Sequence, residues 1–326
     1  MKFPKVCIVI LNWNGKNLLK DCLSSLFKLT DYPNYKVIVV DNGSIDGSVE
    51  FVKKKFPKVD VLALDKNYGF SKGNNIGIKY ALKKYRPKYI LLLNNDTKII
   101  QKDWLTKLVE TAENDKKVGI VGPKLIYPDG RIQHAGVSIK SLKHRGTYEP
   151  GSMYTTIEEV DAVTGACMLI STKTISKIGC LDEVYSPYTL EDIDLCIRAK
   201  HSGFKIIFNG KVVVIHQESV SIKKKISAER FYFILRNRLI LLFRYYPTHI
   251  KILEVLKSFL RIFISRKDSH LPFYGKNIRF NRDFSLRFFL FISGIFQALV
   301  SCSKFKTKFE ILDKSLLRKK IEHGFY

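Results

Sequence analysis

The sequence predicts an α/β protein with a mostly parallel central sheet, followed by a basic, amphipathic helical C-terminal region. Short apolar segments alternate with helical patterns over the first 220 residues, these segments end in small polar residues, and Lys and Arg are concentrated toward the C-terminus. Apolar strands separated by amphipathic helices are typical of parallel sheets that are covered on both faces. We therefore expect one domain over residues 1–220 and a separate region over residues 221–326.

Strand and helix patterns follow one another closely in the first hundred residues. The apolar runs predict strands at 5–12, 35–42, 59–65 and 88–96, and helical periodicity predicts helices at 17–28, 48–56 and 71–85. Two later apolar runs, 163–170 and 211–219, also have the pattern of buried strands. A further helix is expected to begin near Glu191.

Small polar residues stand at the ends of the first four predicted strands. They are Asn12, Asn14 and Gly15; Asp41, Asn42 and Gly43; Asn67 and Gly69; and Asn94, Asn95 and Asp96. Asn and Gly also close strands and open turns, which is a sufficient reason for each of them taken alone. Asp41 and Asp96 differ, because a buried carboxylate costs free energy unless it meets a donor or a metal. Since parallel sheets bind ligands beyond the carboxyl ends of their strands, a ligand site is expected there.

Five sequence blocks resemble the family 2 inverting glycosyltransferases, and they are most similar to the rhamnosyltransferase-like branch. They are VCIVILNWNGKNLLKDCLSSL, VIVVDNGSIDGSVEFV, NYGFSKGNNIGI, YILLLNNDT and TGACMLISTKTISKIGCLDEVYSPYTLEDIDLCIRAKHSGFKI. The resemblance extends roughly over residues 5–245. It implies a GT-A fold, which binds a nucleotide-sugar in the crevice at the strand ends.

The resemblance also implies roles for the polar residues at this edge. Asn94, Asn95 and Asp96 occupy the place of the family's DXD element, with Asn94 where the first Asp would be. Asp96 would then hold the Mg²⁺ or Mn²⁺ that bridges the donor's diphosphate, since these cations prefer oxygen ligands. Asp41 would accept a hydrogen bond from the nucleotide base. The other expected donor-binding residues are Asn12, Asn14, Asn67, Gly69, Asn74, Asn94 and Asn95.

Two later residues have more than one interpretation. His216 lies near the end of the predicted strand 211–219, where a lone His is compatible with a core or turn position. The resemblance implies a place near the diphosphate, as a second metal ligand. Arg236 matches a basic element that follows in relatives, where it would contact either the diphosphate or lipid phosphates.

Three acids cluster at the predicted helix start in LEDIDLCIRAKHSG, residues 190–203. Acids are favourable in a first helical turn, which accounts for Glu191, Asp192 and Asp194 without any catalytic role. A carboxylate at this place also suits a general base that takes the proton from an attacking acceptor hydroxyl. The resemblance implies that Asp192 is this base, supported by Glu191, Asp194 and Gly165 on the acceptor-side strand. With no covalent nucleophile, the reaction would be a single displacement with inversion.

The net charge of +26 is distributed unevenly. From Ile222 onward there are 23 Lys and Arg against 7 Asp and Glu, interleaved with aromatic and aliphatic clusters. Nucleic-acid binding is one interpretation of so basic a region. Its high apolar content favours helices that lie on an anionic membrane surface. The longest uncharged run, 288–303, has 16 residues, below the roughly 20 that span a bilayer.

Two further features bear on the cellular compartment. The six cysteines show no CxxC pairs, so neither a zinc site nor a dense disulfide framework is indicated. The first apolar run covers only Val6 to Leu11, shorter than the roughly 7–15 residues of a signal-peptide core. We therefore expect a cytoplasmic protein that is peripheral on the inner face of the cell membrane and does not bind nucleic acid.

Three other classes of protein were weighed against the glycosyltransferase. A nucleotidyltransferase needs a Gly-rich, Arg-bearing loop after the first strand, and NWNGKN has one Gly and no Arg. A processive polysaccharide synthase would add several membrane spans and a Q-x-x-R-W block, and neither is found. A catalytically inactive scaffold at the membrane surface is the remaining alternative. The sequence predicts transfer of a sugar from a nucleotide-sugar to a glycan or lipid-linked acceptor.

Overall fold

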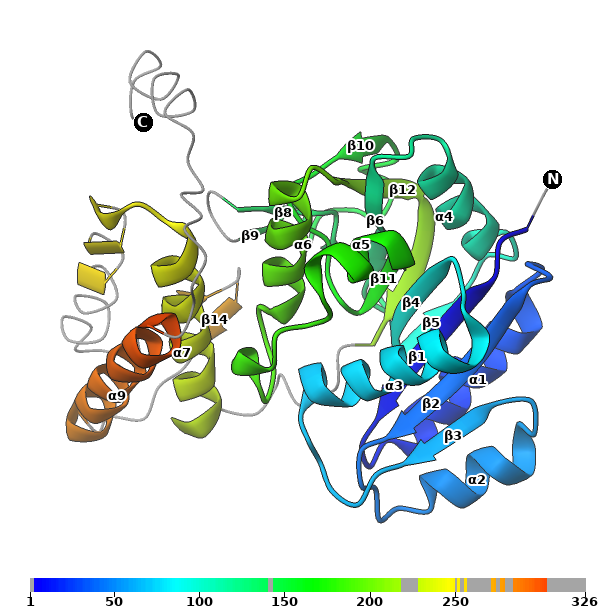
Figure 1. The fold of residues 1–326 in the computed structure, drawn as a ribbon, viewed down its shortest axis with the longest axis horizontal. Coiled ribbons are helices and arrows are strands. Elements are labelled where there is room, and N and C mark those ends of the chain that lie inside the picture. The colour runs from blue at the N-terminus through cyan, green and yellow to red at the C-terminus, as the bar shows by residue number, and fades with distance from the viewer. Residues whose placement is uncertain are drawn as a thin grey trace. The chain divides into compact units, whose positions relative to one another are not determined.

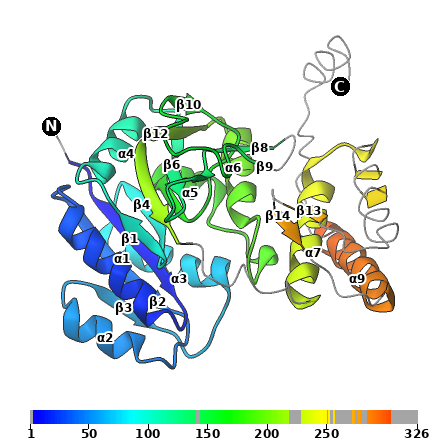
Figure 2. The same cartoon turned by 180° about the vertical axis from the view of Figure 1, so that it is seen from behind.

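The computed structural model describes residues 3–139, 143–217, 228–249, 251–252, 255–256, 271–273, 276–278 and 284–303. By its internal contacts the chain divides into two compact units, Met1–Lys223 and Lys224–Tyr326. Figures 1 and 2 show the elements of both units from opposite sides.

Four parallel strands form one half of the sheet in the first unit. They are β1 (Val6–Asn12), β2 (Tyr35–Asp41), β3 (Asp60–Ala63) and β4 (Tyr89–Asn94), in the order β3-β2-β1-β4. The interiors of β1, β2 and β4 are apolar and buried, as expected of strands that are covered on both faces, whereas β3 at the end of this order is only partly buried. The register places Asn12 beside Asp41, so the polar strand ends meet at one edge (Figure 1).

The other half of the sheet is mixed. It contains β6 (Val118–Ile126), β10 (Ile157–Glu159), β11 (Cys167–Ser171) and β12 (Lys205–His216), with the short strands β5 (Thr97–Ile99) and β7 (Ile132–His134) attached to it. A small separate hairpin joins β8 (Val137–Ser138) to β9 (Lys143–His144). β11 runs antiparallel to both β4 and β6. Consequently the start of β11, rather than its end, lies at the carboxyl edge of β4.

Helices cover both faces of this sheet (Figures 1 and 2). They are α1 (Lys16–Leu29), α2 (Ser48–Lys55), α3 (Phe70–Tyr85), α4 (Trp104–Glu113), α5 (Thr172–Ile178) and α6 (Glu191–His201). Ile8 of β1 belongs to one buried cluster with Leu23 of α1 and Leu108 of α4. Val9 points the other way, toward α3, where a Cβ on Gly77 would lie 2.5 Å from it. Gly77 therefore permits the close packing of α3 on the sheet.

The predicted mostly parallel sheet is confirmed, and several boundaries differ from the prediction. The strand expected at 211–219 begins earlier, as β12, and its last residue is His216. The strand expected at 163–170 begins only at Cys167, so Gly165 lies in the preceding loop. Neither β5 nor β7 was predicted, because three-residue strands are too short to show a periodic pattern.

The second unit contains the helices α7 (Ala228–Tyr245) and α9 (Phe284–Ser303) and a hairpin of β13 (Leu271–Phe273) and β14 (Lys276–Ile278). Gly294 of α9 lies against Leu235 and Leu239 of α7. Among the helices that the structure describes, none is both long and apolar enough to cross a membrane. The basic segment 304–326 and most of the cluster 255–264 lie outside the described residues.

Some of the apolar residues of the second unit are buried, and others are exposed. Leu241 on α7 and Phe291 on α9 are buried, so these two large side chains are not available to a bilayer. The exposed apolar residues of α9 are Ile292, Phe296, Leu299 and Val300. Their spacing of four, three and one places them on one face of the helix.

Candidate functional site

The carboxyl ends of β1, β2 and β4 are linked by a chain of side-chain hydrogen bonds. Asn95 Nδ2 donates to Asn12 Oδ1 at 2.7 Å, and Asn12 Nδ2 donates to Asp41 Oδ2 at 3.0 Å. The other oxygen of Asp41 accepts from the backbone N–H of Ser44 at 2.8 Å. These bonds fix the buried Asp41 carboxylate at the edge of the sheet. Both of its oxygens keep a second lone pair for a ligand.

The loop after β1 is tied to the loop after β2. Asn14 has a left-handed backbone conformation, with φ of 48°, and its Oδ1 accepts from the N–H of Ile45 at 2.9 Å. Its own N–H donates to Ser44 Oγ at 2.8 Å. Trp13 lies between the two predicted donor-binding residues Asn12 and Asn14, and 56% of its surface is exposed. Trp13 was not predicted as a site residue, although its position in the sequence between Asn12 and Asn14 could have indicated one.

Asn67, Gly69 and Asn74 make mainly local contacts. Asn67 Oδ1 accepts from Asn42 Nδ2 and from the N–H of Gly69, both at 2.8 Å. Gly69 has a φ of 81°, and a Cβ there would come within 3.1 Å of the Pro187 backbone. Asn74 Nδ2 donates to the carbonyl of Phe70 within α3. These residues shape the edge and attach the start of α3 to the loop that precedes α6.

The Asn94-Asn95-Asp96 segment is held against the end of β12. β4 ends at Asn94, and β5 begins at Thr97, which lies opposite His216 in the antiparallel pairing of β5 with β12. The turn between them places Asp96 Oδ1 3.0 Å from Nε2 of His216. Asn94 Nδ2 lies 3.3 Å from the same ring nitrogen. The structure thus brings together the two residues that were predicted as metal ligands.

The acids of α6 reach the same edge through the loop before β11. The N–H of Asn94 donates to the carbonyl of Ala166 at 2.9 Å. The adjacent Gly165 N–H donates to Asp192 Oδ2, also at 2.9 Å. Asp192 Oδ1 accepts from the N–H of Ile193 at 2.8 Å. Both Asp192 oxygens therefore accept from backbone N–H groups, and Asp192 lies in the first turn of α6, a position that favours a negative charge.

The contribution of Gly165 to the site is its backbone N–H and not the absence of a side chain. A Cβ built on it would lie 3.5 Å from the Cβ of Asp192, which is an ordinary van der Waals distance. The space at this position does not require a glycine. The contact that matters is the hydrogen bond from its backbone to the Asp192 carboxylate.

Glu191 is buried beside Asp192. Burial, and secondarily the Asp192 charge, raise the pKa of its carboxyl well above the usual value of 4.5. Within the described residues, Glu191 Oε2 has no hydrogen-bond partner. The neutral acid is the form that this environment favours, since an isolated buried carboxylate is strongly penalised.

Asp194 has a structural role. It is fully buried, and its Oδ2 accepts from Arg198 Nε at 2.7 Å while its Oδ1 accepts from the Tyr185 hydroxyl at 3.2 Å. Arg198 also donates to the carbonyls of Ile178 and Cys180. This buried pair anchors the 178–185 segment to α6, on the side of the helix away from Asp192 Oδ2 and Gly165.

Arg236 and the possible metal ligands complete the set of predicted residues. Arg236 lies on α7 of the second unit, where it donates to Asn237 Oδ1 and stacks over the ring of Phe233. Burial lowers the pKa of its guanidinium below the ordinary value of 12.5. No group of three or more His, Cys, Asp or Glu suited to a metal occurs in the part of the chain that the structure describes. Asp96 and His216 form a pair, so most ligands of a cation there would have to come from elsewhere.

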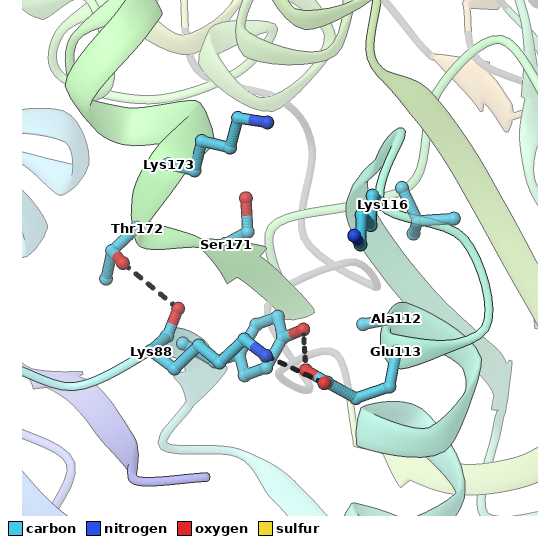
Figure 3. Close-up of a pocket in the computed structure, with 9 residues that line it drawn as sticks. Lys88, Ala112, Glu113, Lys116, Ser171, Thr172 and Lys173 are labelled. Atoms are coloured by element: carbon cyan, nitrogen blue, oxygen red, sulfur yellow. Dashed lines mark hydrogen bonds and ion pairs between the residues drawn. The ribbon is translucent and has the colours of Figure 1, made fainter.

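A pocket of about 270 Å³ lies at the opposite edge of the sheet, where β4 and β6 begin and β11 ends (Figure 3). Its charged residues are Lys88, Glu113, Lys116 and Lys173. Lys88 and the Tyr89 hydroxyl both donate to Glu113, so this acid is already neutralised by the protein. The pocket therefore lacks the converging acids and amides of the carboxyl edge, and we do not assign the activity to it.

Comparison with known proteins identifies the domain to which this edge belongs. Residues 7–178 match the sequence model of the family described as Glycosyl transferase family 2. An uncharacterised protein, y4gI, of Sinorhizobium fredii is 32% identical over 231 residues, which are 67% of this chain and 25% of that protein. The O-antigen biosynthesis protein RfbC of Myxococcus xanthus is 28% identical over 230 residues, 67% of this chain and 18% of that protein. The chain thus spans a quarter or less of these two relatives.

One relative of similar size bears a more specific name. The N-acetylglucosaminyl-diphospho-decaprenol L-rhamnosyltransferase of Mycobacterium tuberculosis is 24% identical over 241 residues, covering 66% of this chain and 76% of that enzyme.

Solved structures of glycosyltransferases share the fold. The mannosyltransferase PcManGT of Pyrobaculum calidifontis, in complex with GDP-Man and Mn²⁺, aligns with a TM-score of 0.52 at 14% identity, covering 98% of this chain and 80% of that one. GalNAc-T7 with UDP, GalNAc and Mn²⁺ aligns with a TM-score of 0.61 at 16% identity, covering 93% and 57%. The expected GT-A fold is confirmed by these alignments.

Proposed function

Because this chain belongs to glycosyltransferase family 2, we propose that it transfers a sugar from a nucleotide-sugar to a glycan or lipid-linked acceptor, with inversion at the anomeric carbon. The observation that carries this proposal is the Asp192 carboxylate, which two backbone N–H groups hold at the start of α6. Through Gly165 and Ala166 it is joined to Asn94, at the same sheet edge as Asp41 and Asp96.

The donor's nucleoside would bind beside Asp41. The carboxylate is fixed by Asn12 and Ser44, and its remaining lone pairs would accept from an N–H of the base. The exposed ring of Trp13 offers an aromatic face at the same place, and every nucleobase has a face that stacks on such a ring. Asn14 would support this loop through its bonds to the loop after β2.

A divalent cation fits the geometry of Asp96 and His216. Two neighbouring ligands of an octahedral ion with bonds of about 2.1 Å lie about 3 Å apart. Asp96 Oδ1 and His216 Nε2 are separated by 3.0 Å. These two residues would hold Mg²⁺ or Mn²⁺, and the bound ion would neutralise charge on the departing diphosphate. With two protein ligands, cation binding should depend on the nucleotide's phosphates.

Asp192 would act as the general base. The acceptor oxygen forms its bond to the anomeric carbon while the bond from that carbon to the diphosphate oxygen breaks, and the diphosphate leaves with the bonding electrons. The acceptor's proton passes to a carboxylate oxygen of Asp192, which keeps lone pairs beyond its two backbone bonds. One displacement on one carbon inverts its configuration.

The decisive variant is Asp192→Asn, which is nearly isosteric and retains an acceptor for the Gly165 N–H. We expect it to bind nucleotide-sugar as the wild type does and to transfer sugar about 10²–10⁴-fold more slowly, as when a general base is lost. Asp21→Asn, at an exposed acid on α1, is the charge-matched control and should keep full activity.

The same experiment separates the enzyme from an inactive scaffold. A panel of nucleotide-sugars with Mg²⁺ or Mn²⁺ would first identify the donor by thermal stabilisation and by slow hydrolysis. An inactive scaffold would show binding without turnover in the wild type and no difference in Asp192→Asn. Weakened donor binding with unchanged turnover in that variant would contradict the role of Asp192.

The second unit would hold the enzyme at the cytoplasmic face of an anionic membrane, near a lipid-linked acceptor. Two observations support this. Ile292, Phe296, Leu299 and Val300 form an exposed apolar face on α9, and the chain from residue 222 onward carries a net charge of +16. An apolar helix face together with abundant Lys and Arg is typical of helices that lie in the headgroup region of anionic bilayers.

Flotation with vesicles tests this attachment. The full-length protein should rise with vesicles containing phosphatidylserine, and high salt should release only part of it, because apolar burial is not screened. Phe296→Ser with Leu299→Ser should abolish the salt-resistant fraction. Ile157→Ser, at another exposed apolar residue on β10, should not change it. Complete release of the wild type by salt would contradict insertion of α9.

A further inference from the structure

Besides Asp96 and Asn94, the ring of His216 has a buried partner on β7, a strand outside the five sequence blocks described above. Gln133, the middle residue of β7, places its Oε1 2.5 Å from Nδ1 of His216. Gln133 is 7% exposed and His216 is 9% exposed, so solvent competes little for this bond. The two residues are 83 positions apart in the chain and meet only through the fold.

The neighbours of the ring determine where its proton lies. Gln133 Oε1 can only accept a hydrogen bond, so Nδ1 must carry the proton. Asn94 Nδ2 is a donor 3.3 Å from Nε2, and a neutral ring satisfies both amides with its proton on Nδ1 and its lone pair on Nε2. The ring is then the Nδ1–H tautomer. Its Nε2 lone pair faces Asp96 Oδ1 at 3.0 Å.

In this tautomer the Nε2 lone pair is available to bind a cation together with Asp96, as the proposed metal site requires. In metal sites the second nitrogen of a ligating His usually donates to a carbonyl or carboxylate, which fixes the tautomer and makes the ligand more basic. Gln133 Oε1 has this relation to His216.

We propose that Gln133 is a positioning residue for the metal site, which keeps His216 in the Nδ1–H tautomer with Nε2 directed at Asp96. This inference rests on the proposed role of Asp96 and His216 in holding a divalent cation. Gln133 itself touches neither donor nor cation.

The position of β7 makes this role possible. β7 pairs antiparallel with β6, with Leu125 opposite His134 and Ile126 opposite Ile132. Side chains alternate along a strand, so Gln133 points to the opposite face from Ile132 and His134. His134 instead accepts from the N–H of Thr164 and contacts His144. One three-residue strand thus contacts the His216 ring on one face and the loop before Gly165 on the other.

Two substitutions at Gln133 separate positioning from packing. Gln133→Met keeps the volume and removes the acceptor, whereas Gln133→Glu keeps an acceptor for Nδ1–H. Ile132→Val, on the same strand with its side chain on the other face, is the control for a general disturbance of β7. All three are made in the full-length chain, and circular dichroism and Tm establish that each is folded.

The first readout is Mn²⁺ binding, measured by calorimetry and by electron paramagnetic resonance in the presence of UDP or dTDP. We expect Gln133→Met to bind Mn²⁺ about 10–100-fold more weakly, the usual cost of losing such a partner. Gln133→Glu and Ile132→Val should stay close to the wild type. Equal losses in Gln133→Met and Gln133→Glu, or in Gln133→Met and Ile132→Val, would overturn the proposal.

The second readout does not depend on the metal. The ¹⁵N shifts of the His216 ring, assigned by comparison with His216→Asn, report the tautomer in the metal-free protein. The Nδ1–H form should be the major tautomer in the wild type. In Gln133→Met its fraction should decrease and that of the Nε2–H form should increase. Any other protonation pattern in the wild type overturns the inference. If the wild type binds no Mn²⁺ with either nucleotide, the metal part of the proposed function fails, and the tautomer measurement still decides the role of Gln133.

Discussion

The two edges of the central sheet hold acids in opposite circumstances. At the amino edge, Glu113 accepts from both Lys88 and the Tyr89 hydroxyl (Figure 3). At the carboxyl edge, Asp96 Oδ1 lies 3.0 Å from Nε2 of His216, and Nδ1 of the same ring contacts Gln133 Oε1. Both edges contain charged residues within a short distance of one another. At the carboxyl edge, the two proposed ligands of a cation lie within 3.0 Å of each other.

The difference indicates how a binding edge is distinguished from an ordinary polar surface. A pocket lined with Lys is common on so basic a chain. The negative charge of Glu113 in this pocket is compensated by Lys88. At the carboxyl edge the amides fix the acids in place without neutralising them, as Asn12 does for Asp41. Variants at the two edges should therefore affect different properties, activity at one and stability at the other.

The largest effect is expected from Asp96→Ala. Losing the cation's carboxylate ligand removes several kcal/mol of stabilisation from the departing diphosphate, which corresponds to about 10³-fold or more in transfer rate. Folding should be retained, because alanine keeps the backbone hydrogen bond between residue 96 and Gln217 and removes only a side chain in the turn between β4 and β5. Transfer assays and thermal denaturation without metal check the two halves of this expectation.

Mn²⁺ calorimetry provides the control for Asp96→Ala. The wild type should bind the ion tightly only when a nucleoside diphosphate is present, and the variant should bind it weakly in either case. Tight binding to the nucleotide-free protein, unchanged by the substitution, would place the metal elsewhere.

A smaller effect, on stability and with a defined pH dependence, is expected from Glu191→Gln. Burial raises the pKa of the Glu191 carboxyl in the folded protein, so its contribution is favourable below about pH 4.5 and is lost as pH rises toward the folded value. Gln does not titrate. The Tm of the variant minus that of the wild type should therefore increase between about pH 5 and about pH 8.

The control for this prediction is Glu159→Gln, which removes a negative charge from an exposed residue on β10. Its Tm difference from the wild type should change less with pH than that of Glu191→Gln. A constant difference for Glu191→Gln would mean that Glu191 is ionised in the folded state and finds a compensating partner.

The smallest effect is expected at the amino edge, from Glu113→Gln. Burial acts to raise the pKa of this carboxyl, but the hydrogen bonds from Lys88 and Tyr89 outweigh it and lower the pKa below 4.5. Its stabilising contribution is present above about pH 4.5 and is lost as pH falls through the folded value. The pair is partly exposed, so the variant should lose about 0.2–1 kcal/mol of stability at neutral pH.

Transfer activity provides the comparison between the edges. Glu113→Gln should transfer sugar at the wild-type rate, in contrast to Asp96→Ala. A large loss of activity in Glu113→Gln would show that the pocket in Figure 3 contributes to catalysis, and the distinction drawn between the two edges would be wrong.

β1, β2, β4 and the helices between them could be predicted because these strands have six or seven residues with buried apolar interiors. β3 has only four residues, and it was predicted from the apolar run 59–65. The same apolar pattern predicted where these strands end. The residues at the predicted ends include Asn12, Asp41 and Asp96. The position of Asp192 at the start of α6 was also accessible, since the acids stand before a helical apolar face. In these cases the signal is local in the chain.

Other parts of the site depend on contacts that no local pattern contains. Gln133 meets His216 across 83 residues, and β7 has only three residues. The amide of Gly165 could not be recognised as a donor to Asp192, because its usefulness depends on where β11 begins. The ion pair between Asp194 and Arg198 was not predicted either. Arg198 stands four residues later on the same helix, a spacing that was available in the sequence.

The pairing of β5 with β12 has a consequence for engineering chimeras within this fold. Thr97 lies opposite His216, and the N–H of Gln217 donates to the carbonyl of Asp96, so the register of three residues determines which side chains share the site. Inserting or deleting one residue between Asn94 and Ile99 would turn alternate side chains to the other face and separate Asp96 from His216. Segments exchanged with other glycosyltransferases to alter donor choice should therefore include β4, β5 and the end of β12 as one block, with the spacing of NNDT unchanged.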